Sequence, residues 1–357
     1  MLNALRRKYK TLNTVRINAE ALKNNLKLYQ RLLPNQAICP VIKSNAYGHG
    51  LTTVAKILDS QNLEFLVVDS LYEAYELKKV RIKTPILILG YTFPENLKKG
   101  LPFHFAASDL ETAKHLAKLG LKTHLEVDTG MARTGFPLEN LRETLNQLKD
   151  LNLVGLFSHF ADADNPADPS YTNEQSKRFR KAIKLTHEAG FSPKYIHLSN
   201  SAGALKAEVP GLNMARIGIS LYGASPLEEE PQLKGLKPVM EVVSTITATR
   251  ELKAGQSVSY NCTFTAKKDM RIGVIPFGYY EGIPRSLSNV PPFLGRICMN
   301  HTIIDLTDSD LQIGDEFTVY SANPNKENSF RNLAQKAQTI PYELMTGIAE
   351  SIRRTVT

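Results

Sequence analysis

A lysine directly after an apolar run is the residue of this sequence with the clearest chemical potential. Residues 37–42 are apolar or small apart from Pro40, and Lys43 is followed at once by the polar, glycine-rich residues 44–50. This pattern predicts a buried strand that ends in a loop, with the lysine at its C-terminal end. A lysine at the edge of an apolar wall loses hydration, and its amine can then form a Schiff base. The alternative is a lysine that only snorkels to the surface.

Two other loops have the composition of a phosphate-binding site. Asn200-Ser201-Ala202-Gly203 follows the apolar run 195–198, and Gly218-Ile219 follows the run 214–217. A phosphate group needs backbone N–H groups, small hydroxyls and little side-chain bulk. An Asn-Ser pair is also a common helix cap, so the composition alone leaves both interpretations open.

Such residues need a scaffold that brings several strand ends together. Eight short apolar runs alternate with helical stretches, the first of which is the amphipathic segment 19–33. The runs cover residues 38–43, 65–68, 85–89, 103–107, 123–127, 153–158, 195–198 and 214–217. This alternation predicts an α/β fold, a (β/α)8 TIM-type barrel whose chemistry lies at the C-terminal strand ends. A doubly wound sheet is the rival, but its glycine fingerprint after the first strand is missing.

The character of the sequence changes near Pro238. We therefore expect the barrel over residues 13–237 and a mainly β C-terminal domain over residues 238–357, with a partly helical end after residue 329. The β runs cover residues 240–250, 257–260, 271–276, 302–306 and 316–320. Residues 1–12 have no place in a barrel.

Composition limits the class of protein and its partners. The chain has 357 residues, of which 42% are hydrophobic, and no apolar run is long enough to span a membrane. Its formal charge of +9 comes from scattered basic residues with acidic ones between them, which argues against a nucleic-acid surface. Three distant cysteines and a start without an apolar leader favour a cytoplasmic protein with reduced thiols. No Cys/His cluster has the spacing of a metal site.

The motifs together resemble the alanine racemase family over residues 14–354. The resemblance is carried by the lysine motif 41–50, by the patterns 197–203 and 215–226, by Asp128-Thr129-Gly130-Met131, and by the segment 295–300. It implies a fold-type III enzyme that depends on pyridoxal 5'-phosphate and interconverts L- and D-alanine through a cofactor aldimine and two-base proton transfer. It also implies a supply of D-alanine for peptidoglycan, a homodimer with active sites shared between subunits, and packing of residues 1–12 against the C-terminal domain.

The resemblance gives each cofactor-binding residue a role. Lys43 carries the cofactor, Arg216 faces its ring nitrogen, His197 supports Arg216, and His159 stacks on the ring. The phosphate ligands come from two tyrosines and the two loops described above: Tyr47, Tyr342, Asn200, Ser201, Gly218 and Ile219. An arginine keeps its proton, so it donates to the ring nitrogen without protonating it. That weaker electron sink suits racemisation more than transamination.

Racemisation needs an acid–base group on each face of the substrate's Cα. The resemblance gives these roles to Lys43 and to Tyr260, which we expect to reach the barrel of a second subunit. A lone tyrosine in a β run would otherwise be read as a packing residue.

The substrate carboxylate is expected to bind Arg133, with Met299 also lining the substrate site. Relatives usually carry a carbamylated lysine where this chain has Glu126, and we expect Glu126 to orient Arg133 directly or through water. Other departures are Asn261 for a glycine, Asn300 for an aspartate, Tyr280-Glu281-Gly282 for a version with smaller residues, and a shortened segment 289–295. The entrance is expected to include Asp164, Tyr279, Arg285 and Arg296.

Three other functions compete with this one. A racemase of serine or of a broader amino acid range is one alternative, and Tyr342 beside a small pocket favours alanine over it. A barrel-type amino acid decarboxylase would need an acidic partner for the ring nitrogen, which Arg216 does not provide. A non-catalytic carrier for pyridoxal phosphate would be a single barrel, without the residues after Pro238.

Overall fold

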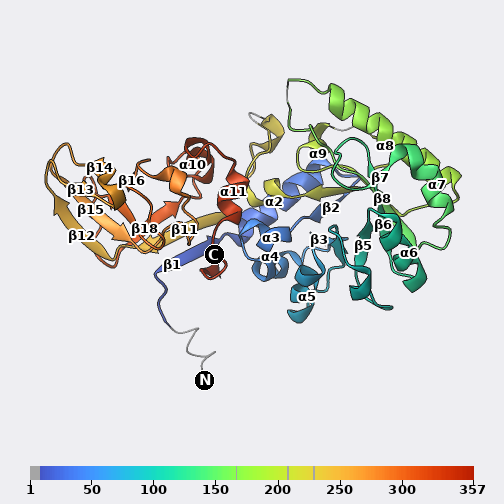
Figure 1. Ribbon diagram of the computed structural model, residues 1–357, viewed down its shortest axis with the longest axis horizontal. Helices are drawn as coiled ribbons and strands as arrows, with labels where there is room; N and C mark the ends of the chain where they lie inside the picture. Colours follow the sequence, from blue (N-terminus) through green and yellow to red (C-terminus); the bar gives the residue numbers. More distant parts are fainter. Residues whose placement is uncertain (1–8, 166, 207–208, 228–229) are drawn as a thin grey trace. The chain divides into compact units, whose positions relative to one another are not determined.

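The chain folds into two compact units (Figure 1), and the computed structural model describes residues 9–165, 167–206, 209–227 and 230–357. The larger unit holds residues 22–46 and 51–237, and the second unit holds residues 47–50 and 238–357 together with the described residues up to Ala21. The first eight residues of the expected N-terminal segment 1–12 lie outside the described residues.

Parallel strands close into a barrel in the larger unit. Among the described residues, eight strands follow the order β2-β10-β9-β8-β6-β5-β4-β3, and a bridge between Val41 and Val67 joins the two ends of this series. They are β2 (Ala37–Pro40), β3 (Leu66–Val68), β4 (Ile86–Ile88), β5 (His104–Ala107), β6 (Thr123–Asp128), β8 (Leu153–Phe157), β9 (Tyr195–His197) and β10 (Met214–Ile217). The predicted (β/α)8 barrel is confirmed, and each strand lies within its predicted run or within a residue of it.

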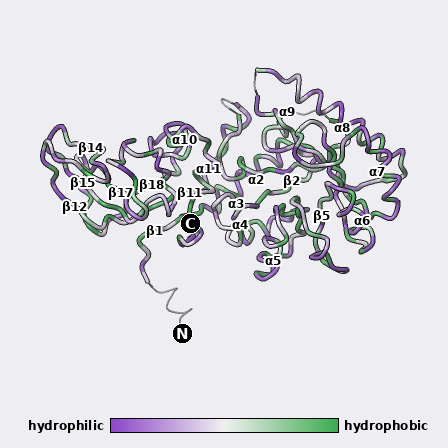
Figure 2. Tube along the Cα trace, viewed as in Figure 1, coloured by the Kyte–Doolittle hydropathy of each residue, from purple (hydrophilic) through white to green (hydrophobic). Residues whose placement is uncertain are grey.

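Helices connect the barrel strands (Figure 1). The connecting helices are α4 (Leu51–Leu58), α5 (Leu71–Lys79), α6 (Leu110–Leu119), α7 (Leu141–Asn146), α8 (Ser170–Glu188) and α9 (Gly203–Lys206), and α2 (Ala19–Leu32) precedes the first barrel strand. Asn18 caps α2, because its Oδ1 accepts a hydrogen bond from Ala21 N at 2.8 Å. The longest helix, α8, mixes hydrophilic and hydrophobic residues as expected for an amphipathic surface helix (Figure 2). No helix within the described ranges is long and apolar enough to cross a lipid bilayer.

The second unit is mainly β, as predicted, and most of its strand pairs are antiparallel. One sheet has the order β18-β11-β1-β19, another has the order β12-β15-β17-β16, and β13 pairs with β14. Its strands are β1 (Asn13–Ile17), β11 (Met240–Thr245), β12 (Ala248–Leu252), β13 (Ser257–Val258), β14 (Phe264–Thr265), β15 (Met270–Ile275), β16 (Phe293–Leu294), β17 (Thr302–Asp305), β18 (Glu316–Tyr320) and β19 (Arg353–Val356). Two helices, α10 (Phe330–Lys336) and α11 (Pro341–Thr346), precede the last strand.

Strand β1 belongs to the second unit and not to the barrel. It pairs antiparallel with β11 and parallel with β19. We expected barrel sequence from residue 13, whereas this pairing places residues 13–17 in the sheet of the C-terminal region. Val15 and Ile17 are buried and their neighbours are less so. Such alternation predicts a half-buried strand but does not say which sheet it joins.

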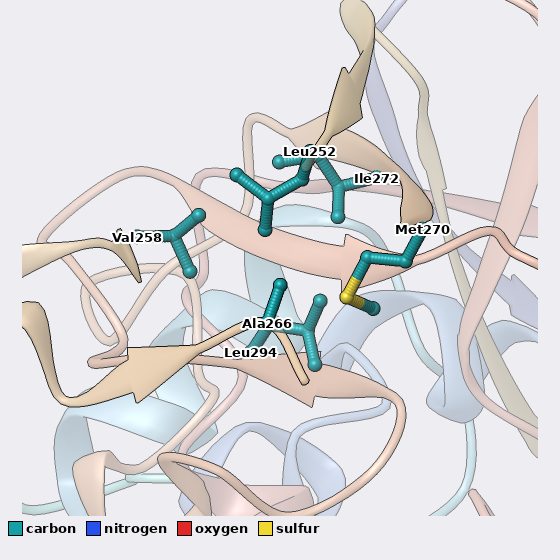
Figure 3. Packing of buried hydrophobic residues seen from close by; sticks show 6 residues of the cluster. All are labelled: Leu252, Val258, Ala266, Met270, Ile272 and Leu294. Carbon is teal, nitrogen blue, oxygen red and sulfur yellow. The ribbon is translucent and has the colours of Figure 1, made fainter. Parts of the chain in front are cut away.

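A compact apolar cluster supports the β13–β14 hairpin (Figure 3). It consists of buried residues from several strands and loops: Leu252, Val258, Ala266, Met270, Ile272 and Leu294. Val258 comes two residues before Tyr260, so the cluster fixes the base of the segment that carries this tyrosine.

Candidate active site

Lys43 lies at the C-terminal end of β2, followed by an unusual backbone turn. Val41 N and Ile42 N still donate to barrel carbonyls, to Ile217 O and Val67 O at 2.8 Å each. The short element α3 (Lys43–Tyr47) then turns left-handed, with φ between 52° and 55° from Ser44 to Tyr47. A left-handed backbone conformation costs a non-glycine residue on the order of 1 kcal/mol or more, so several such residues in succession are unfavourable by themselves. Other contacts must therefore impose this turn.

Glu73 and Asn45 hold the turn in place. Glu73 Oε1 accepts a hydrogen bond from Ser44 N at 2.6 Å, while its Oε2 accepts from Asp69 N at 2.8 Å. Asn45 Oδ1 accepts from Leu51 N, the first residue of α4, at 2.8 Å. Sequence reasoning missed Glu73. Its only signal was the capping box formed by Ser70 and Glu73 at the start of α5, which predicts a helix start and not a contact with the lysine turn.

The lysine amine has a carboxylate partner that was also not predicted. Lys43 Nζ donates to Asp69 Oδ1 at 3.0 Å, and both side chains are partly exposed. Asp69 follows β3, the barrel neighbour of β2. The structure thus places Lys43 at the strand-end mouth expected for it.

Arg216 is the most tightly held of the predicted residues. It lies on β10 and is only 3% exposed. Its Nη1 contacts His197 Nδ1 at 2.6 Å, and its Nη2 contacts His159 Nδ1 at 3.2 Å. Nη2 also donates to Ser158 O at 2.8 Å. The structure therefore brings together the three residues that were predicted around the cofactor ring.

Burial controls the protonation of this cluster. Desolvation lowers the pKa of Arg216 to about 10, so the guanidinium stays charged at neutral pH. Burial lowers the pKa of His159 to about 3, and the positive charges of Arg216, Arg133 and Lys43 act in the same direction. Burial likewise holds the pKa of His197 well below its ordinary value. Both histidines are therefore neutral hydrogen-bond acceptors for Arg216.

The two predicted phosphate loops meet at the ends of β9 and β10. Gly218 N donates to Ser201 Oγ at 3.1 Å, which joins the loops. Gly203 N donates to Asn200 Oδ1 at 2.8 Å and begins α9. Ile219 opens a short 3-10 turn, Ile219–Tyr222. Small side chains and clustered backbone amides at strand ends are the composition that a phosphate group requires.

Arg133 and Glu126 do not form the direct pair that was considered. Glu126 lies on β6 and is 7% exposed, whereas Arg133 is exposed. No ion pair joins them among the interactions of the described residues. Burial raises the pKa of Glu126, although hydrogen bonding to Thr134 and the charges of Arg216 and Arg133 oppose this effect. Contact through water remains a prediction.

The two predicted phosphate tyrosines approach each other within the second unit. The ring centroids of Tyr47 and Tyr342 are 6.4 Å apart, with the planes tilted by 53°. Tyr342 lies on α11, and Gly48 lies so close to this helix that a Cβ on Gly48 would be 1.9 Å from Met345 O. Gly48 also has a φ of 81°, so glycine is required here for space and for conformation.

Tyr260 lies at the tip of the β13–β14 hairpin with 67% of its surface exposed. Ser259 fixes the backbone before it, because its Oγ donates to Arg296 O at 2.6 Å. Asn261, where the family resemblance predicts a glycine, has a φ of 60°. Asparagine is one of the few side chains that tolerate this region, so the replacement preserves the turn.

Asn300, where the family resemblance predicts an aspartate, is paired with Glu281. Asn300 Nδ2 donates to Glu281 Oε1 at 2.8 Å, and Glu281 Oε2 accepts from Gly278 N at the same distance. An aspartate at position 300 would face the carboxylate of Glu281, so the amide suits the larger acidic neighbour. Met299 precedes this pair and is 57% exposed.

Comparisons with known proteins agree with this geometry. Residues 17–226 match the family "Alanine racemase, N-terminal domain", and residues 239–356 match "Alanine racemase, C-terminal domain". The chain is similar to alanine racemase 2 of Caldanaerobacter subterraneus subsp. tengcongensis, with 33% identity covering 95% of this chain and 93% of that protein. It resembles the solved alanine racemase of Clostridium difficile 630, with a TM-score of 0.90, 30% identity, and coverage of 98% and 97%. A third relative is the alanine racemase of Bacillus anthracis solved with bound L-Ala-P, with a TM-score of 0.88, 27% identity, and coverage of 98% and 96%.

Proposed function

The chain belongs to the alanine racemase family, and we propose from this membership and from the barrel site that it interconverts L-alanine and D-alanine with pyridoxal 5'-phosphate. The observation that carries the proposal is the buried, charged Arg216 held by two neutral histidines, because such a group suits a ring nitrogen that must stay unprotonated.

The residues present fit this cofactor. A primary amine at Lys43, a buried guanidinium at Arg216 and two joined loops of small residues correspond to its aldehyde, ring nitrogen and phosphate. Lys43 would hold the aldehyde carbon and His159 would lie against the ring. Asn200, Ser201, Gly218 and Ile219 would bind the phosphate with Tyr47 and Tyr342. When bound, pyridoxal phosphate withdraws electrons from the amino acid's Cα and makes its proton removable.

Two protein groups then handle the proton. Lys43 Nζ serves one face of Cα, and Tyr260 Oη serves the opposite face. Tyr260 is exposed at the tip of a hairpin whose backbone is fixed, which suits a residue that reaches the barrel of a partner subunit. The enzyme is thus a homodimer with shared active sites.

Arg133 binds the substrate carboxylate, and Met299 lines the substrate site. Glu126 supplies a fixed negative charge that orients Arg133, through water because no direct ion pair is present among the described residues. A small amino acid is the substrate, with alanine preferred. We place the enzyme in the cytoplasm, where it supplies D-alanine for peptidoglycan. We keep the domain boundaries proposed from the sequence, which are 1–12, 13–237 and 238–357, except that β1 joins the C-terminal sheet.

Mixed dimers test the shared site directly. Lys43→Ala and Tyr260→Phe subunits carrying different tags are refolded together, and the mixed dimers are purified. If the site is shared, one site in each mixed dimer combines an intact Lys43 with the partner subunit's Tyr260, so activity returns on mixing. If each subunit uses only its own residues, mixing restores nothing.

A substrate assay separates the competing functions. The wild-type protein with added cofactor is given L-alanine, L-serine and other amino acids, and D-enantiomers and CO2 are measured. D-alanine without CO2 supports the proposal, and equal rates with serine indicate a broader racemase. CO2 release would indicate a decarboxylase, and the absence of both products would indicate a cofactor carrier.

A further inference from the structure

Three buried histidines continue from Arg216 through the barrel interior. Arg216 Nη1 lies 2.6 Å from His197 Nδ1, His197 Nε2 lies 2.8 Å from His124 Nδ1, and His124 Nε2 lies 3.0 Å from His104 Nδ1. The exposed fractions of His197, His124 and His104 are 0%, 0% and 7%. His197 is the last residue of β9 and His104 is the first of β5, so the series runs from the C-terminal strand ends toward the N-terminal ends.

The direction of every hydrogen bond in this series follows from Arg216. A guanidinium has only donors, so His197 Nδ1 must accept, and the proton of His197 must be on Nε2. That Nε2–H can only donate to His124 Nδ1, which places the proton of His124 on its own Nε2. The same step places the proton of His104 on Nε2. All three imidazoles are therefore neutral and have the same tautomer.

A glycine makes room for the middle ring. Gly155 on β8 is the register partner of His124 on β6, and a Cβ on Gly155 would lie 2.1 Å from His124 Nδ1. Its φ is not in the left-handed region, so space and not conformation requires glycine here. Glycine inside a strand is destabilising, so Gly155 lowers the stability of the barrel. Its missing side chain leaves room for the His124 ring to contact His197.

Aromatic rings enclose the series. Phe157 stacks on His197 with centroids 4.9 Å apart, and Tyr195 stacks on His124 at 5.6 Å. Phe65 contacts both His124 and His104 edge-on. Low polarity around the bonds strengthens them, and aligned hydrogen bonds polarise one another.

We propose that His197, His124 and His104 form a one-directional relay of neutral dipoles that stabilises the charge of Arg216 in place of a carboxylate counter-ion, with His124, His104 and Gly155 as positioning residues. Every lone pair in the relay points toward Arg216 and every N–H points away from it. Among the described residues, the carboxylate of Glu126 acts on Arg216 electrostatically but forms no ion pair with it, so the charge of Arg216 stays available to the cofactor's ring nitrogen. This role rests on the proposed function, whereas the tautomers do not.

Nitrogen NMR of the histidines tests the relay without any assay of activity. In protein labelled with ¹⁵N-histidine, long-range ¹H–¹⁵N correlations report which ring nitrogen carries the proton, with and without bound pyridoxal phosphate. We expect Nε2–H for His104, His124 and His197 at neutral pH. His187 on α8 is an internal control, because its Nδ1 lies 3.1 Å from Phe191 O and must carry a proton there. An Nδ1–H tautomer or an imidazolium at His124 or His197 overturns the relay.

Variants at His124 separate positioning from simple packing. In His124→Asn, Oδ1 can accept from His197 near the former Nδ1, whereas His124→Leu fills space without accepting. Leu should lower kcat at least about tenfold, the rate equivalent of one unpaired buried donor, with little change in KM for alanine. It should also shift the absorbance maximum of the bound cofactor. Asn should restore most of both properties, and His187→Ala should change neither.

Equal activity and spectra in the Leu and Asn variants would contradict the positioning role. Gly155→Ala provides a second route, because its methyl group displaces the His124 ring without removing a polar atom and should resemble the Leu variant. If the wild-type protein shows no racemase activity but the expected tautomers, the relay stands and the proposed function fails. If NMR shows other tautomers while racemisation persists, the relay fails and the proposed function stands.

Discussion

The barrel site and the Tyr260 hairpin are constructed in opposite ways. Arg216 is 3% exposed and makes hydrogen bonds to two histidines and to main-chain carbonyls. Tyr260 is 67% exposed, and only the backbone on either side of it is fixed, by Ser259 and by the apolar cluster under Val258 (Figure 3). One region sets the orientation and protonation of a charged group before any ligand arrives. The other sets only the position of a loop.

This contrast teaches where each kind of function can be placed. A charge that must be buried needs an interior network around it, and a barrel core with parallel strand ends can provide one. A proton donor that must reach a separate binding surface has to remain accessible, and a short hairpin on a packed base provides that.

Tyr260→Phe sharpens the contrast with the largest expected effect. Removing the hydroxyl should slow racemisation by about 10²–10⁴-fold, the usual contribution of a general acid–base group, without changing cofactor affinity. Lys43 still serves its own face, so one enantiomer should exchange its α-hydrogen with deuterated solvent without inversion. Mass spectrometry combined with chiral chromatography measures this exchange. Unchanged racemisation would remove Tyr260 from the mechanism.

Acid should destabilise the barrel before the second unit, because the buried histidines with lowered pKa values lie in the barrel. Burial lowers the pKa of His104 to about 4 and that of His159 to about 3, both below the ordinary 6.5. Their stabilisation is therefore complete above pH 6.5 and is lost as the pH falls toward these values, on the order of 3 kcal/mol from His104 alone. Hydrogen exchange at decreasing pH should show the barrel strands losing protection before the sheets of the second unit. Equal loss in both units would contradict this prediction.

Asn300→Asp tests whether Asn300 and Glu281 in the second unit depend on each other for stability. The new carboxylate would face Glu281 Oε1 in place of an amide donor 2.8 Å away. We expect a loss of about 1–3 kcal/mol in the free energy of unfolding at neutral pH, because the buried carboxylate of Glu281 loses its donor from the exposed Asn300. Adding Glu281→Gln should recover most of the loss. Denaturant titration of the single and double variants measures the coupling, and additive effects would show that the two residues are independent.

Glu126→Gln should have the smallest effect on stability and the opposite sign. Burial raises the pKa of Glu126, so the stabilisation by its protonated form is lost as the pH rises through the folded-state value. The neutral glutamine avoids this loss, so the variant should melt at a higher temperature than wild type at pH 8, with the difference vanishing in acid. KM for alanine should rise if Glu126 orients Arg133. A melting temperature lower than wild type at pH 8 would contradict the burial argument.

Much of the barrel could be predicted because each strand shows its local pattern. Apolar runs such as residues 195–198 and 214–217 correspond to β9 and β10, and the loops after them do meet at Ser201 and Gly218. The cluster of Arg216, His159 and His197 was predicted only through the family resemblance, because an isolated arginine or histidine is usually structural. The structure then supplied the hydrogen bonds that join them.

The parts that could not be predicted depend on contacts across the fold. Lys43 and Ser44 contact Asp69 and Glu73. These two partners come from the next strand and helix of the barrel, β3 and α5, and no local pattern links them to the lysine. The series from His197 to His104 depends on strand register and on the missing side chain at Gly155. The single run predicted for residues 240–250 became two strands, β11 and β12, that join different sheets. Periodicity describes one strand at a time and cannot reveal such arrangements.

The left-handed turn after Lys43 has a consequence for anyone who engineers this protein for heat resistance. Glycine at position 44 would adopt the required backbone without steric conflict, so selection for melting temperature should favour it there. The same replacement would widen the range of conformations open to the neighbouring amine. Thermostable variants obtained this way should therefore have a less uniformly placed Lys43, and screens that follow heat tolerance alone would discard catalytic speed without detecting its loss.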